Sequence, residues 1–338
     1  MKRKILFAVA LLATMTAAAQ NIAAVSPSNA TTIFQTLDEA IAGAESGSTI
    51  YLPGGGFQIK DETKINKKLT IMGVSHRGDT DNVDGATVIS GNLHFEEGSS
   101  GSAILGIYVS GNINVGTANT PVTNFTVRYC NVNSIQVKNS QSSGMVVNQS
   151  YLRSGSSFGD SNAKITNNIL HSLVGINNGE IYYNIILNES TTYWGNAYSK
   201  PRHTAIGANL SRIRNNVIIE YDRNTNTGGY YYAIEGSNNQ ITSNMNMGSI
   251  GEDCIIIPAG SDWNNVFEHW NNGAISHISK FHFKDKYKQY ERQVGIYAGN
   301  GFSDEKSLAP IPRIISKKVA ESTDESGKLQ IIVKVKAQ

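Results

Sequence analysis

The chain has 338 residues, and its 29 Lys and Arg nearly balance its 27 Asp and Glu, which leaves a net charge of +2 at pH 7. This near-neutral balance gives no reason to expect binding to nucleic acid or to an anionic membrane surface. Only two cysteines are present, which excludes a disulfide-rich scaffold. We expect both of them, Cys130 and Cys254, to be unpaired and buried.

The first 19 residues have the features of a secretory signal peptide. A basic start is followed by an apolar run from Ile5 to Ala13 and by an Ala-x-Ala motif that ends at Ala19. No later apolar run is long enough to cross a bilayer. The sequence therefore predicts a secreted protein in the periplasm, at the cell surface or outside the cell, and we expect it to be a monomer.

A short helix and a strand are predicted next. Thr36 and Glu39 stand at capping-box spacing, and apolar residues along one face predict a helix from Thr36 to Ala44. The segment GSTIYLPGGG, Gly47 to Gly56, predicts a buried strand that ends at a glycine corner. Because the first strands of an open stack expose unpaired backbone groups, we expect the helix to cover that edge.

A short phrase, apolar-x-x-Asn-apolar, then recurs through the middle of the chain. The copies begin at Val127, Val147, Ile165, Ile181, Ile213 and Ile241. Repetition of one strand-sized unit is typical of a solenoid, and short β-branched runs closed by Gly, Asn or Ser favour strands over helices. With roughly 20 residues and three short strands per turn, the sequence predicts an all-β right-handed parallel β-helix.

Two further alignments follow from the repeat. Leu93, Ile113 and Ile135 predict a second column of stacked strand residues, and Ile107 is predicted to align with Val127. The fourth position of the phrase predicts a column of stacked polar side chains in which each amide bonds the next. Its members are Cys130, Ser150, Asn168, Asn184, Asn216 and Asn244.

These motifs resemble those of known secreted β-helix proteins. The helix followed by GSTIYLPGGG resembles the start of pectate-lyase-like β-helix proteins. The I-x-N-N-x-I coils and the ending VGIYAGNGF, Val294 to Phe302, resemble secreted right-handed β-helix proteins of the Bacteroidetes type. The resemblance covers about Ala30 to Phe302 and implies the architecture. It leaves the activity open, because the same scaffold carries lyases, hydrolases, adhesins and tail spikes.

The chain is thus divided into a signal peptide (1–19), a β-helix (20–303), and a linker with a hairpin-like tail (304–338). In the tail, Ile331, Val333 and Val335 alternate with Lys334 and Lys336, as in a half-buried strand. These strands are predicted either to cover the last coil or to serve as an export or attachment signal.

Two insertions interrupt consecutive repeats and contain most of the candidate binding residues. Ile206 and Ile234 stand at equal distances before the repeats at Ile213 and Ile241, so both insertions should leave the coil near the same corner. Aromatic faces stack on sugar rings, and charged or amide groups bond their hydroxyls, so a composite glycan site is predicted. In the alternative interpretation, these aromatic rings pack the two inserted loops against the outer wall of the β-helix. The candidates are Tyr193, Trp194, Tyr198, Arg223, Tyr230, Tyr231 and Tyr232.

The alternative function is a polysaccharide lyase or glycoside hydrolase that acts on an acidic polysaccharide, and the sequence leaves open whether the protein is an enzyme. Lyases on this scaffold use Lys or Arg as the base, with Ca²⁺ or Arg on the substrate carboxylate. Lys200, Arg202 and His203 are the candidate catalytic residues. No cofactor or metal is predicted, because the histidines are scattered and the Asp79 to Asp84 loop misses a calcium-binding spacing.

One further phrase resembles a catalytic motif. GEDCIIIPAGS, Gly251 to Ser261, is similar to the GDDCI strand of polygalacturonases, in which paired Asp carboxylates act as acid and base. Here Glu252 replaces the first Asp, and the other motifs of that family are missing. Asp253 is therefore interpreted as a corner residue.

Overall fold

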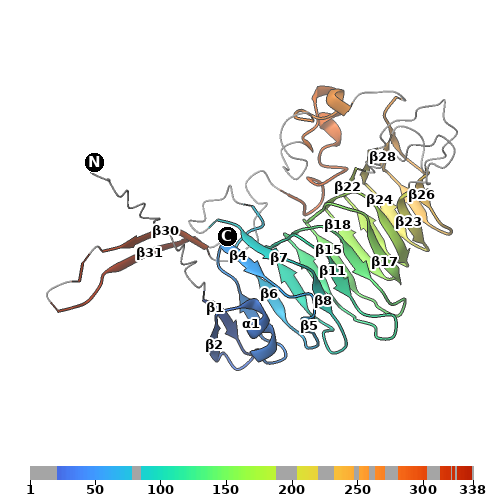
Figure 1. Ribbon diagram of the computed structural model, residues 1–338. Coiled ribbons are helices and arrows are strands. Elements are labelled where there is room, and N and C mark those ends of the chain that lie inside the picture. The colour runs from blue at the N-terminus through green and yellow to red at the C-terminus, as the bar shows by residue number, and fades with distance from the viewer. Residues whose placement is uncertain are drawn as a thin grey trace, which may run out of the picture.

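The structure is a computed structural model that describes residues 21–77, 85–187, 204–219, 232–246, 251–258, 263–270, 281–302, 313–320, 322–323 and 326–336. The chain winds into stacked coils that visit three long sheets in turn (Figure 1). From the third strand onward, neighbouring strands in each sheet are parallel, as the pairs in the middle of the stack show. The protein is a parallel β-helix, as predicted.

The three sheets have 11, 10 and 8 strands and are called A, B and C. Sheet A contains β2 (Thr31–Phe34), β1 (Ile22–Val25), β3 (Thr49–Tyr51), β6 (Thr70–Met72), β9 (Ala103–Leu105), β12 (Thr126–Arg128), β15 (Met145–Asn148), β18 (Ala163–Thr166), β21 (Glu180–Tyr182), β24 (Arg212–Arg214) and β27 (Gln240–Thr242).

Sheet B contains β4 (Gly55–Gln58), β7 (Thr87–Ser90), β10 (Tyr108–Val109), β13 (Asn131–Val132), β16 (Tyr151–Leu152), β19 (Ile169–Leu170), β22 (Ile185–Ile186), β25 (Val217–Ile218), β28 (Met245–Asn246) and β29 (Ile255–Ile256). Sheet C contains β5 (Lys64–Ile65), β8 (Leu93–Phe95), β11 (Ile113–Val115), β14 (Ile135–Val137), β17 (Ser156–Ser161), β20 (Leu173–Asn177), β23 (Thr204–Asn209) and β26 (Tyr232–Glu235).

The core is built from columns of stacked apolar residues that point into the coils. In sheet A the register joins Ile50, Ile71, Ile104, Val127, Val147, Ile165, Ile181, Ile213 and Ile241. The six repeat starts predicted from the sequence are therefore one column, and the predicted column of Leu93, Ile113 and Ile135 is confirmed in sheet C. The alignment of Ile107 with Val127 is wrong, because Val127 pairs with Ile104.

The predicted asparagine column is confirmed at the corner between sheets A and B. Asn168, Asn184, Asn216 and Asn244 are fully buried. The Oδ1 of Asn216 accepts hydrogen bonds from both the backbone N–H and the Nδ2 of Asn184, each at 2.9 Å. The same pair of bonds joins Asn168 to Asn184 and Asn216 to Asn244. The ladder thus satisfies backbone donors that the tight corner turns away from the sheets.

Each ladder residue follows a residue in left-handed backbone conformation, which turns the chain from sheet A into sheet B. The φ angles run from 47° to 59° at Tyr129, Gln149, Asn167, Tyr183, Asn215, Ser243 and Asp253. Asp253 is therefore a corner residue, as the sequence predicts, and its neighbour Cys254 continues the column after Asn244, since Met245 pairs with Ile255. This strained backbone conformation is stabilised by the neighbouring coils, because every coil turns in the same way at this corner.

The N-terminal end of the stack is covered as predicted. The helix α1 (Leu37–Gly43) begins at Thr36, whose side chain accepts the N–H of Glu39, while the Glu39 carboxylate accepts the N–H of Thr36. Its buried residues pack over β1 and β2, which add to sheet A in antiparallel orientation. Among the described residues, no helix is long and apolar enough to cross a membrane.

The C-terminal part of the chain departs from the coil pattern. Sheet B ends at β29. The described residues 263–270 and 281–302, although predicted to belong to the β-helix, form a lobe with 3₁₀ helices at Trp263–Asn265 and Asp285–Tyr290. The lobe has an aromatic core that packs on the outer face of sheet B, at Ile185, Val217 and their neighbours. Both faces of these short strands are therefore buried, which explains their continuous apolar sequences.

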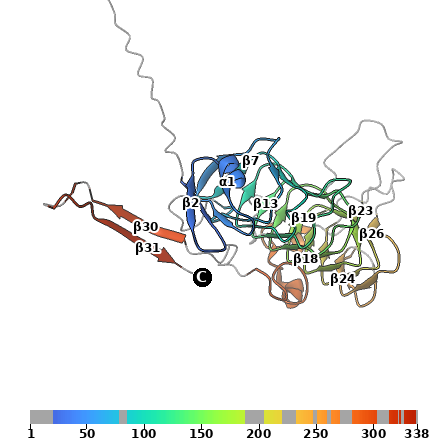
Figure 2. The same ribbon diagram turned by 90° about the horizontal axis from the view of Figure 1, so that it is seen from below.

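The predicted C-terminal strand pair is also present. β30 (Arg313–Val319) and β31 (Ile331–Lys336) form an antiparallel hairpin that is a separate two-stranded sheet. The hairpin projects away from the coils in both views (Figures 1 and 2). Neither strand pairs with a strand of the last coil, so the arrangement seen here is not that of a cover over the final turn.

The expectation that both cysteines are buried is correct for Cys130 and wrong for Cys254, which is partly exposed. The two cysteines are therefore expected to differ sharply in reactivity. Cys130 is fully buried in the ladder column, and this burial raises the pKa of its thiol to about 12. Because the thiolate is the reactive species, Cys130 should resist alkylation of the native protein at pH 8, whereas the partly exposed Cys254 should react. Mass spectrometry after iodoacetamide treatment measures both sites, and denaturation should make them equally reactive. Equal labelling in the native protein would contradict the buried position of Cys130.

Candidate functional site

The two insertions that contain the predicted binding residues leave the coil at neighbouring points. Each begins after a strand of sheet B and ends at a strand of sheet C. β22 pairs with β25, and β23 pairs with β26 through Thr204 and Tyr232, so the flanking strands of the two insertions lie in adjacent coils. Adjacent strands are about 4.8 Å apart, and the equal spacing of Ile206 and Ile234 from the next repeats therefore corresponds to a shared corner.

The predicted site residues themselves fall mainly outside the described residues. This holds for the candidate catalytic residues Lys200, Arg202 and His203 and for the candidate glycan-binding residues Tyr193, Trp194, Tyr198, Arg223, Tyr230 and Tyr231. Tyr232 begins β26 and pairs with Thr204. Asp79, Asp81 and Asp84 also lie outside the described residues.

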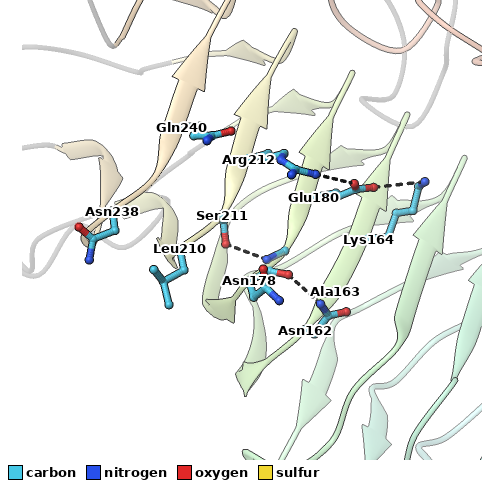
Figure 3. Close-up of a pocket in the computed structure, with 11 residues that line it drawn as sticks. Asn162, Ala163, Lys164, Asn178, Glu180, Leu210, Ser211, Arg212, Asn238 and Gln240 are labelled. Atoms are coloured by element: carbon cyan, nitrogen blue, oxygen red, sulfur yellow. Dashed lines mark hydrogen bonds and ion pairs between the residues drawn. The ribbon is translucent and has the colours of Figure 1, made fainter.

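A polar depression lies on the same coils, at the corner where sheet C turns into sheet A (Figure 3). Its volume is about 550 Å³. It is lined by Asn162, Ala163, Lys164, Asn178, Gly179, Glu180, Leu210, Ser211, Arg212, Asn238 and Gln240. Three of these residues, Asn178, Leu210 and Asn238, have φ between 52° and 57°, which turns successive coils at the same place and aligns their side chains.

The floor of the depression is held by hydrogen bonds between consecutive coils. The buried Ser211 hydroxyl accepts the N–H of Gly179 at 2.9 Å and donates to the Asn209 carbonyl at 2.7 Å. At the rim, Asn162 Nδ2 donates to the Asn178 carbonyl at 2.7 Å. The corner is therefore preorganised by contacts that do not depend on a ligand.

A charged column crosses one wall of the depression on the outer face of sheet A. The register places Lys164, Glu180 and Arg212 in three consecutive coils. Glu180 lies between the two cations, 3.2 Å from Lys164 Nζ and 3.6 Å from Arg212 Nη1. The two cationic side chains are 57% and 63% exposed, so each ion pair is screened and worth at most about 1 kcal/mol. An incoming anion can therefore replace Glu180 as the partner of Arg212 at low cost.

A second arginine extends the cationic surface beside this column. Arg214 lies two residues from Arg212 on the same strand, with its guanidinium carbon 4.2 Å from the centre of the Tyr182 ring. Tyr182 is only 6% exposed, so the ring serves as a support and not as an open stacking platform. Among the described residues, no acidic side chain pairs with Arg214. Stacking orients the guanidinium and leaves its N–H groups available for a bidentate anion.

A strip of sheet C separates the corner at which the insertions leave the coil from the depression. β23 has six residues, which span about 20 Å from the insertion corner to the depression corner. On its outer face, Gly207 lies beside Glu235 of β26. A ligand of that length can therefore reach from the corner at which the insertions leave the coil to the depression.

Metal-ligand clusters of the kind that some enzymes on this scaffold use are absent from the part of the chain that the structure describes. The described residues contain no group of three or more His, Cys, Asp or Glu side chains placed to hold a metal ion. His94, on the outer face of sheet C, has its pKa lowered by burial and by the nearby Lys64. It is therefore neutral near pH 7 and adds no charge to the surface.

The charged column was not among the residues predicted from the sequence. Its signal is nevertheless present, since Lys164, Glu180 and Arg212 each directly precede an isoleucine of the inward column in sheet A. In a strand, the residues on either side of an inward position point outward, so the repeat itself identifies the outer face.

Comparisons with protein-family models, with curated proteins and with solved structures find no match to this chain. The pectate-lyase-like type and the Bacteroidetes type therefore remain expectations drawn from the motifs. The fold class itself is established by the strand pairing.

Proposed function

We propose that this is a secreted or surface-exposed glycan-binding protein that recognises an extended acidic polysaccharide. One observation carries the proposal: the cationic surface of Lys164, Arg212 and Arg214 adjoins a polar depression on the coils from which both aromatic insertions emerge. Secretion is proposed from the signal peptide, and no bound metal or cofactor is required for this function.

The chemistry of the surface suits a sugar acid. Amide groups of Asn162, Asn178 and Gln240 line the depression and can bond hydroxyls, while Arg212 and Arg214 present planar donors that match a carboxylate. Coils repeat about every 4.8 Å, so equivalent side chains recur along the stack as equivalent groups recur along a polysaccharide. A repeating surface of this kind favours a polymer over a single small molecule.

Whether binding requires a negatively charged glycan is tested with one oligosaccharide in two forms, unesterified polygalacturonate and its methyl ester. Arg212→Gln and Arg214→Gln should each weaken binding of the acidic form roughly 10-fold, because each removes a charge-assisted hydrogen bond of about 1.5 kcal/mol. Isothermal titration calorimetry measures the affinities. Arg128→Gln is the matched control, since Arg128 is an exposed arginine on the same face of sheet A outside the depression.

The same assay tests the insertions and the enzyme alternative. Trp194→Ala and Tyr231→Ala should each weaken binding by about 1 to 3 kcal/mol if these rings are anchors. Absorbance of unsaturated uronate products, followed in parallel, would identify a lyase, and loss of turnover in Lys200→Ala with retained binding would assign its base. Equal binding of the acid and its ester would contradict the acidic preference, and no binding to any glycan would contradict the function.

A further inference from the structure

Exposed apolar side chains are concentrated at two places among the described residues. Of the large hydrophobic residues that are strongly exposed, Val174, Leu210 and Ile256 occur singly. The remainder belong to the C-terminal hairpin, namely Val319, Leu329, Ile331, Ile332, Val333 and Val335, or to the N-terminal end of sheet A, namely Ile33 and Tyr51. Single exposed residues are normal on a protein surface, whereas contiguous apolar surfaces indicate an interface.

The first of these surfaces is one face of the hairpin. The register pairs Val319 with Ile331, and Val333 and Val335 follow on the same face, which we call the hairpin face. These four side chains are 43 to 56% exposed. An isolated two-stranded hairpin is marginal in water, so its apolar face needs a cover.

The second surface is a row of residues across the outside of sheet A, which we call the apolar stripe. The register joins Ile33, Ala23, Tyr51, Met72 and Leu105 from five neighbouring strands. Ile33 and Tyr51 are 52% and 44% exposed. Further along the same row the residues become polar, beginning with Arg128. The apolar part is therefore confined to the N-terminal end of the stack.

The two surfaces match in length and chemistry. β31 has six residues and spans about 20 Å, and the stripe crosses four strand spacings, or about 19 Å. The opposite face of the hairpin contains the exposed Lys318 and Lys334, which would remain in water after docking, together with the exposed Ile332.

We propose that the hairpin face of one chain docks on the apolar stripe of a second copy, and that two copies exchange hairpins about a two-fold axis. The hairpin extends away from its own coils (Figures 1 and 2), as an exchanged arm does. One such contact is small for a stable interface, whereas a reciprocal exchange doubles the buried surface. The dimer replaces the monomer expected from the sequence.

Sedimentation of the mature chain, residues 20–338, over a range of concentrations tests the proposal. Val333→Glu on the hairpin face and Tyr51→Glu on the stripe should each weaken dimerisation at least roughly 10-fold, because a charge would be buried in an apolar contact. Two control variants introduce glutamate outside the proposed contact. They are Lys334→Glu on the opposite hairpin face and Ile256→Glu at the far end of the stack. Both controls should dimerise as the unchanged chain does, and unchanged circular dichroism would confirm that every variant is folded.

Mixing the two variants separates an exchange from other arrangements. A Val333→Glu chain retains its stripe and a Tyr51→Glu chain retains its hairpin face, so the mixture should form heterodimers with one intact contact. An effect of Val333→Glu without an effect of Tyr51→Glu would mean that hairpins pack on each other, which overturns the assignment of the stripe. A monomer at all concentrations also overturns the proposal, including the case in which the hairpin folds back on its own stripe.

Discussion

Replacing Asn216 by leucine should destabilise the protein by about 3 kcal/mol or more, because it breaks the buried ladder at its centre. The two side chains have the same number and branching of heavy atoms, so the main chemical change is the loss of the amide hydrogen bonds. Asn216 is fully buried, its Oδ1 accepts from Asn184, and its Nδ2 donates to Ile181, Arg214 and Asn244. Leucine leaves the buried N–H of Asn184 without the acceptor that the ladder provides.

Two further variants calibrate this result. Asn216→Ser should cost less, since Ser150 occupies the same column and its hydroxyl accepts the Cys130 N–H at 3.2 Å. Asn119→Leu, in an exposed turn, should change the free energy of unfolding by less than about 0.5 kcal/mol. Urea unfolding followed by circular dichroism measures all three. A midpoint for Asn216→Leu equal to that of Asn119→Leu would show that the ladder contributes nothing to stability.

The coil architecture could be predicted because each coil repeats the same physical requirements. An inward apolar residue, a left-handed corner and a buried amide recur together, so the spacing of Val127 and the later repeat starts is enough to identify one column. The wrong alignment of Ile107 with Val127 also results from this repetition. The separation of these two residues matches the repeat, but Ile107 precedes β10 and stands in line with Cys130 of the ladder. The spacing of apolar residues identifies the length of the repeat, but it leaves the alignment of one coil on the next ambiguous by a few residues.

The C-terminal lobe could not be predicted from periodicity, because its position depends on the outer face of the coils. Ile185 and Val217 extend an apolar run in the sequence, and such a run does not reveal that one of its faces is covered by a distant segment. Asn167 Nδ2 donates to the Ala298 carbonyl at 2.8 Å across this contact, although the two residues are far apart in the chain. The cationic surface escaped prediction for a related reason, since Arg212 and Arg214 become neighbours of Lys164 only after the coils stack.

Replacing Gly236 by alanine should be the most damaging single-methyl addition in the described coils, with an expected loss of at least about 3 kcal/mol. Gly236 has φ of +116°, a conformation that L residues rarely adopt, and its added Cβ would overlap the carbonyl oxygen of Ala208 in the coil below. The obstacle is backbone, so a side-chain rotation cannot relieve it. The two coils must separate, which disrupts the pairing of β23 with β26.

Gly207→Ala is the matched control, because Gly207 lies in the adjacent coil of the same sheet. Its φ is not positive, and an added Cβ would meet Val174 at 3.4 Å, which is close to an ordinary contact. That variant should therefore change stability by less than about 0.5 kcal/mol. Hydrogen exchange should show faster opening of β26 and β27 in Gly236→Ala alone. Since β27 provides Gln240 to the depression, the same variant should also weaken binding of an acidic glycan, whereas Gly207→Ala should bind normally. Equal stability of the two variants would mean that the coils tolerate separation at this corner, and the depression would then not be the preorganised surface that the hydrogen bonds of Ser211 indicate.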